Sequence, residues 1–349
     1  MNRTISVIFR LIPLAMAVFC VGYGLFILNW GKDPDRMVAG PVVTALGAIC
    51  VALFCTAATI IRQILGTYTT AARWGLPILG YIMGVGTIIV GLVLVGRAET
   101  NQQFVAAHVV TGIGFIACCV ATAATSSTKF TLIPQNSKHK RVGHVPDNTF
   151  SVGAERVLES ITVISAVVLW VWAIALLSQA STEHAKEFIA GHVVAGLAAI
   201  CTCLIALVST IVRQIRNVYT EKEAVFWPWM VLGVATVMFL WGLYVAIAYV
   251  GSTVHVIGFI VIGLSLVCFS ISSKVILLAK LWWKKFPLTN RIPMIPIFTA
   301  LACCFLASFM FELATTTPDF FIPARVLMGL GAVCFTLFSI VSILESGAS

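Results

Sequence analysis

The chain has 349 residues, of which 60% are hydrophobic and only 10% are charged, and its mean hydropathy is +1.03. A soluble globular chain would carry roughly 25% charged residues, so this composition excludes that class and indicates a membrane protein. The formal net charge is +9. Its basic residues are scattered over short segments, so nucleic-acid binding is not expected.

Long stretches without Asp, Glu, Lys or Arg predict ten transmembrane helices in chain order. An apolar run that follows Arg3 resembles a signal peptide, but it continues through Leu28 and is better explained as a first span. The stretch 224–273 is too long for one span and breaks at Gly251-Ser252-Thr253. The stretches are 11–31, 37–61, 74–96, 100–128, 160–182, 188–212, 224–273, 292–311 and 326–344. Helices are expected because lipid offers no partner to backbone groups.

Lys and Arg set the predicted orientation. With the N-terminus in the cytoplasm, seventeen of them fall on the cytoplasmic side and five on the other side, which is a strong positive-inside bias. Both termini are therefore predicted to be cytoplasmic. The cytoplasmic loop 129–153 is the one long connection. It is interpreted as a flexible connector, or alternatively as a contact for anionic headgroups or a partner protein.

A short motif recurs five times, each time early in an apolar segment. Its first small residue is Gly40, Ala107, Gly191, Gly258 or Ala324, and five residues later stands Ala45, Gly112, Gly196, Gly263 or Gly329. A Leu or Ile follows directly, and Cys50, Cys118, Cys201, Cys268 and Cys334 close the five copies. Successive copies are 67, 84, 67 and 66 residues apart, which is about two spans. We therefore expect one transmembrane domain, 1–349, built from two-helix repeats at approximately 1–70, 71–130, 154–220, 221–286 and 287–349.

Repeats of two spans all enter the membrane in the same direction, as in other parallel-repeat membrane folds. The hypothesis is that five hairpins close into a pseudo-fivefold ring with the motif helices inside. An irregular bundle that descends from duplications is the alternative. The small residues are predicted to serve helix packing, with the slim wall of a cavity or pore as the second interpretation. They are Gly40, Gly112, Gly191, Gly196, Gly258, Gly263 and Gly329.

Ionisable residues near the span ends are the candidate site. His108, His192 and Arg325 each follow the first motif residue, near the outer face, and Glu312 is a candidate partner of Arg325. In a ring these residues would meet at an outer mouth, where His could respond to acid. The plainer interpretation is that each has a structural hydrogen bond. Glu155 and Glu159 lie one helical turn apart and form a candidate acidic pair at the inner mouth, or merely suit the helix dipole.

The eleven cysteines indicate neither a disulfide framework nor a zinc site, because they lie within spans and lack the spacing of metal ligands. No phosphate loop and no pairing of a nucleophile with a base stands out. We therefore expect no metal, no cofactor and no enzymatic activity.

The motif segments resemble a known family. Asn290–Thr299 and Phe321–Glu345, together with Phe104–His108 and Phe188–His192, are similar to the YhiM-like family of enterobacterial inner-membrane proteins. The resemblance spans the whole chain and is most specific in the last sixty residues. It implies a multi-pass inner-membrane protein without an assigned biochemical activity, linked loosely to acid-stress tolerance.

Two functional classes follow. The first is a channel or transporter for protons or a small solute, responsive to acid stress. The second is a non-transporting membrane protein that senses pH or acts as a scaffold. The spans carry few polar residues at mid-membrane, which counts against tightly coupled ion transport and is compatible with a narrow apolar pore. The lipid bilayer is the expected partner; an oligomer is compatible with the sequence, and the solute is not specified.

Overall fold

The computed structural model describes residues 3–29, 33–65, 67–128, 152–180, 185–252, 254–283 and 292–348. These residues form ten long helices and one short 3₁₀ helix, with no strand among them. The predicted loop 129–153 lies outside the described residues except for its last two. The helices are α1 (Arg3–Asn29), α2 (Pro34–Ile64), α3 (Thr70–Gly96), α4 (Asn101–Ser127), α5 (Val152–Gln179), α6 (Ala185–Ile215), α7 (Glu221–Ala248), α8 (Val256–Trp283), α9 (Met294–Leu313), η1 (Pro318–Phe320) and α10 (Phe321–Ala348).

All ten helices are long and apolar enough to span a membrane, with η1 leading into the tenth span. The fold is therefore all-helical and polytopic, as the composition predicts. Local sequence signals mark several helix starts. Thr100 and Gln103 form a capping box at the start of α4, Thr220 and Glu223 form another at α7, and the Thr69 side chain caps α3.

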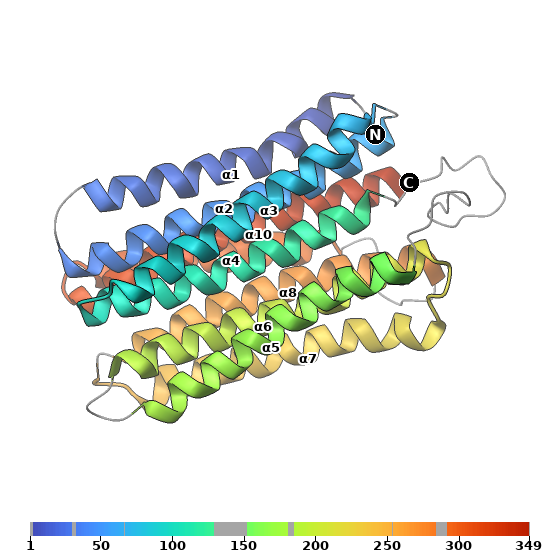
Figure 1. Cartoon of the computed structure of the whole chain (residues 1–349). Coiled ribbons are helices and arrows are strands. Elements are labelled where there is room, and N and C mark those ends of the chain that lie inside the picture. The colour runs from blue at the N-terminus through green and yellow to red at the C-terminus, as the bar shows by residue number, and fades with distance from the viewer. Residues whose placement is uncertain are drawn as a thin grey trace.

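The helices lie roughly parallel, and both chain ends fall at the same end of the bundle (Figure 1). We call this the terminal end. The opposite end, where each odd-numbered helix turns into the next even-numbered one, is the hairpin end. Lys and Arg predict that the terminal end faces the cytoplasm, and that orientation stays a prediction.

Burial separates the helices into two layers. The apolar windows of the even-numbered helices are 78–89% buried, whereas those of the odd-numbered helices are 17–33% buried. Large apolar side chains such as Trp229, Ile247 and Phe305 are exposed on the odd-numbered helices. The even-numbered helices, which carry the repeated motif, therefore form the inner layer, and the odd-numbered helices present apolar surface to lipid.

Contacts among the inner helices form a closed cycle. α2 packs on α4, α4 on α6, α6 on α8, α8 on α10, and α10 packs back on α2. Each outer helix packs on two inner ones: its own hairpin partner and the preceding inner helix, with α1 against α2 and α10. This order of contacts is what five equivalent hairpins around one axis would give. Superposition of the five units by rotation about that axis stays a prediction.

The second small residue of the motif lies between neighbouring inner helices. A β-carbon added to Gly112 would lie 2.6 Å from Leu197 Cδ1, and one added to Gly196 would lie 2.5 Å from Leu264 Cδ1. The same relation joins Gly263 to Leu330 at 2.8 Å and Gly329 to Leu46 at 2.6 Å. Each of these glycines therefore receives the motif leucine of the next inner helix, and the last contact closes the cycle.

The first small residue of the motif lies inside its own hairpin instead. A β-carbon on Gly40 would lie 2.5 Å from Leu28 Cγ on α1, and one on Gly191 would lie 2.7 Å from Leu177 Cγ on α5. At Gly258 the nearest neighbours are main-chain atoms of Ala246 and Gly242 on α7. The two small residues thus serve different interfaces, because they lie on different faces of one helix.

Candidate functional site

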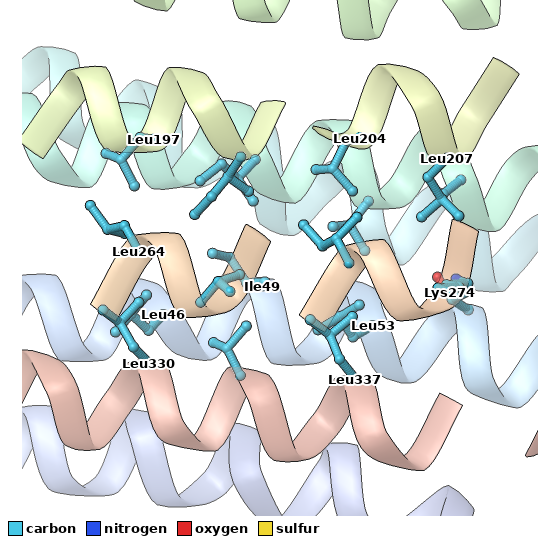
Figure 2. A pocket seen from close by; sticks show the side chains of 18 residues that line it. Leu46, Ile49, Leu53, Leu197, Leu204, Leu207, Leu264, Lys274, Leu330 and Leu337 are labelled. Atoms are coloured by element: carbon cyan, nitrogen blue, oxygen red, sulfur yellow. The ribbon is translucent and has the colours of Figure 1, made fainter. Parts of the chain in front are cut away.

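The inner helices enclose an axis lined by one helical face of each. The lining side chains recur every three or four residues, which keeps them on one face of a helix. Figure 2 shows leucine side chains from neighbouring helices pointing toward one another across this axis. Starting from the motif leucine, the successive layers are Leu46, Leu197, Leu264 and Leu330, then Ile49, Ile116, Ile200, Val267 and Val333, then Leu53, Val120, Leu204, Ile271 and Leu337. We call these three layers the plug.

The plug is narrow and apolar. The cavity along this part of the axis has a volume of about 20 Å³, which is enough for one water molecule. From the first layer to the residue ten positions further, the helices rise about 15 Å, which is half of a bilayer core. The axis is therefore closed to hydrated solutes in this conformation.

At the hairpin end, the same helical face continues into an open vestibule of about 360 Å³. Its floor consists of Val42, Val109, Val193, Ile260 and Val326, one turn before the first plug layer. Its rim is polar, with Asp35, Asn101, Gln102, Lys186 and Asp319. The vestibule therefore narrows from charged groups at its mouth to aliphatic groups at the plug.

One charged side chain lies at the terminal end of the plug. Lys274 of α8 lines the axial cavity together with Thr56, Ala123 and Leu207, each ten residues after the motif Leu or Ile of its own helix. Lys274 is 2% exposed and is the one cation among the buried side chains of the described residues. Figure 2 shows it across from Leu207, beyond Leu204.

The two predicted histidines lie between the helix layers, and the structure does not bring them together. His108 Nδ1 donates to the Phe104 carbonyl (2.7 Å), and its ring lies 5.2 Å from the Trp172 ring on α5. His192 Nδ1 donates to the Phe188 carbonyl (2.8 Å), and its ring stacks 5.8 Å from Trp241 on α7. Neither lines the vestibule or the plug.

Arg325 has a similar position near α1 and α9. Its Nη1 donates to the Phe321 carbonyl (2.9 Å), and its guanidinium lies over the Phe321 and Phe311 rings. It lines a shallow hollow with Tyr23 and Arg36, apart from the axis. Within the described residues it forms no ion pair with Glu312, so these four predicted outer-mouth residues do not form one cluster.

At the terminal end, the two predicted carboxylates differ in burial. Glu155 is buried, and its Oε2 lies 2.7 Å from Nε of Arg216 at the end of α6. Glu159, one turn further along α5, is half-buried. Neither lines the axial cavity. The Glu155–Arg216 ion pair therefore joins an outer helix to an inner one.

Cysteines lie mainly between helices. Cys119 and Cys201 approach to 3.9 Å between α4 and α6, and the Thr336 hydroxyl lies 3.8 Å from Cys50 Sγ between α10 and α2. The cysteines of the described chain are free. Among the residues described, no group of three His, Cys, Asp or Glu side chains could hold a metal ion.

The residues that line the axis were missed by sequence reasoning, although a signal for them exists. Counting in helical turns from the motif leucine reaches Asp35, Gln102, Lys186 and Asp319 eleven residues earlier and Lys274 ten residues later. His108 and His192 were predicted instead because they are ionisable and share one position of the motif. Their register, one residue after the first small residue, places them about 100° from the axial face.

Fold and axis together define a polytopic α-helical membrane protein with a two-layered bundle and a polar-mouthed, plugged central cavity. The family model described as "Protein of unknown function (DUF2776)" matches residues 1–349, and the chain belongs to this family. The chain is 45% identical over its whole length to the inner membrane protein YhiM of Escherichia coli (strain K12), of which it covers 99%. It is thus a multi-pass protein of the inner membrane.

Proposed function

We propose that the axis of the inner bundle is a gated pathway for a small solute and that the plug is its gate. The supporting observation is a single helical face that contributes, in order, the vestibule floor, the plug and the Lys274 layer on the inner helices. Helix packing alone requires an apolar centre. It does not require a polar vestibule at one end of that centre or a charge at the other.

Hydrophobic constrictions gate channels by excluding water, and the plug has the composition for this. The seven-residue distance between Leu46 and Leu53 corresponds to about 10 Å of aliphatic surface along the axis. Opening would require the inner helices to move apart or rotate. Such a movement would have to displace the leucines that pack against Gly112, Gly196, Gly263 and Gly329 at these interfaces.

The test compares a polar substitution on the axis with the same substitution on the lipid face. Leu204→Ser/Leu337→Ser places two hydroxyls in one plug layer and removes bulk, so we expect water and small ions to cross reconstituted vesicles faster than with the parent protein. Leu240→Ser on α7, where Leu240 is 58% exposed, is the control and should not change the flux. Equal flux from the double variant, the control and empty vesicles would contradict the axial pathway.

A second candidate function is acid sensing without transport. It is favoured by the matching environments of His108 and His192, each held between a Phe of its own helix and a Trp of an outer helix. Protonation there would change contacts between the two layers. Acid quenching of tryptophan fluorescence that disappears in His108→Gln/His192→Gln would support it, and a flat pH response would remove it.

Neither proposal includes an enzymatic step. A response to acid stress, whether through the axis or through the histidines, is part of the proposal. Proton passage is the less favoured form of the axial pathway, since the plug layers contain no hydroxyl or titratable side chain to relay a proton.

A further inference from the structure

The charge on the axis carries a more specific inference, which rests on the proposed pathway. Lys274 is a fully buried side chain that reaches the axial cavity, and none of the described residues that line this cavity is a carboxylate. Within the described part of the chain, its ammonium takes part in no hydrogen bond or ion pair. An ammonium without a counter-charge is strongly unfavourable in a medium of low dielectric constant, so such groups are normally paired or neutralised.

Carboxylates at the terminal end interact with other cations. Glu155 pairs with Arg216, Glu223 pairs with Arg213, and Glu345 lies in the field of Lys280. Thr56, in the layer of Lys274, donates its hydroxyl hydrogen to the Ala52 carbonyl of its own helix. The described side chains that surround Lys274 therefore supply no negative charge along the axis.

We propose that Lys274 is the binding site of a small monovalent anion, of about the size of chloride, and makes the axial pathway selective for such anions. The ammonium attracts an anion and repels cations across the low-dielectric plug. The space along this axis is about that of one water molecule, which favours a small monoatomic anion and is too small for a phosphate in this conformation. The charge sits where a permeating ion would leave the plug.

The position of Lys274 within the repeat supports a role in anion binding and not in packing. The equivalent residues on the other inner helices are Thr56, Ala123, Leu207 and Ile340, none of which is charged. A lysine is therefore not needed for packing at this level. Replacing Lys274 with the similarly shaped Met should be tolerated, because exchange of a buried charge for an apolar group is often neutral or stabilising.

One measurement detects the site without requiring transport. Thermal unfolding of the purified protein is compared in chloride and in gluconate, an organic anion too large for the cavity. Because a ligand that binds only the folded state raises its stability, chloride should raise the melting temperature of the parent protein and of Lys280→Met, but not of Lys274→Met. An equal response to both salts, or a chloride shift that persists in Lys274→Met, overturns the proposal.

The second measurement concerns selectivity. In the Leu204→Ser/Leu337→Ser background, reversal potentials under a potassium chloride gradient should show chloride more permeant than potassium. The preference should be kept in Lys274→Arg and lost in Lys274→Met. A cation preference, or a chloride preference unchanged in Lys274→Met, overturns the proposal. Chloride-specific stabilisation without any current in these variants would retain the anion site and reject the pathway.

Discussion

The side-chain amide of Gln214 on α6 donates a hydrogen bond to the main-chain carbonyl of Leu278 on α8, at 3.0 Å. Gln63 on α2 makes the same contact to the Ser127 carbonyl of α4, at 2.8 Å. Both bonds join neighbouring inner helices near the terminal end and span 64 residues of sequence. Two neighbouring pairs of inner helices, α2 with α4 and α6 with α8, are thus joined by equivalent hydrogen bonds.

Removing this amide should weaken the inner layer. We expect Gln214→Leu to lower the free energy of unfolding by about 0.5–1.5 kcal/mol, because an interhelical hydrogen bond in a membrane protein is of this order. Thermal unfolding in detergent measures the change. Thr236→Val on α7 is the control, since the Thr236 hydroxyl is exposed and bonds only within its own helix. An unchanged Gln214→Leu protein would show that packing alone holds this interface.

Overpacking at the motif glycines should destabilise the bundle. In Gly196→Val the new side chain would meet Leu264, whose Cδ1 lies 2.5 Å from an added β-carbon. We expect a loss of about 1–3 kcal/mol, as for other overpacked interiors. Gly86→Val on α3 is matched to it, because no atom lies within 4 Å of a β-carbon there. Equal melting temperatures for the two variants would show that the leucine moves aside without cost.

Breaking the ion pair between Glu155 and Arg216 should affect stability and leave conduction unchanged. Glu155→Gln should destabilise the protein by less than the about 3–5 kcal/mol typical of fully buried pairs, because the Arg216 side chain is 31% exposed. Glu155→Gln/Arg216→Met should recover part of the loss in a double-mutant cycle. Neither residue lines the axis, so a large change in flux at equal folded yield would instead support the acidic inner-mouth site.

The two histidines should not control flux. In the Leu204→Ser/Leu337→Ser background, adding His108→Gln/His192→Gln should leave the ion flux unchanged, because both imidazoles lie between the helix layers.

Asp35→Asn at the vestibule rim, in the same background, should change the ion flux because it alters the charge at the mouth. Reconstituted vesicles under an imposed salt gradient provide the measurement. Loss of flux in the His108→Gln/His192→Gln variant alone would show that the two histidines belong to the pathway.

Both chain ends should face the cytoplasm. Green fluorescent protein fused after Ser349 should fluoresce in intact cells, and alkaline phosphatase fused there should be inactive, because each reporter matures on only one side of the inner membrane. A phosphatase fusion in the α3–α4 connection should be active. The reverse pattern would turn the vestibule toward the cytoplasm and Lys274 toward the outside.

Much of the architecture could be predicted from the sequence, because each element depends on a local property. The uncharged stretches gave all ten spans, including the division of 224–273 near Gly251, where the structure ends α7 at Ala248 and begins α8 at Val256. The family resemblance is confirmed by the match over the full chain. Motif spacing identified Gly196 and Gly263 as small residues in register, but not which helix each one meets.

The candidate site was harder to predict, since it depends on which face of each helix turns inward. His108, His192 and Arg325 share a position in the motif, and each donates to the main-chain carbonyl four residues earlier in its own helix. Sequence periodicity indicates that residues share a face, and in an almost uniformly apolar helix it does not show which face points to lipid, to the hairpin partner or to the axis.

The sequence by itself determined the ten spans, the repeated motif and the family, because hydropathy and residue spacing are properties of short contiguous segments. Only the tertiary structure decided that the even-numbered helices are inside and that Lys274, which has no ion-pair partner among the described residues, lies on their common axis. The reason is physical: the inward face of each helix is selected by how leucines and glycines from segments distant in sequence pack together, and that choice is made by all the helices at once.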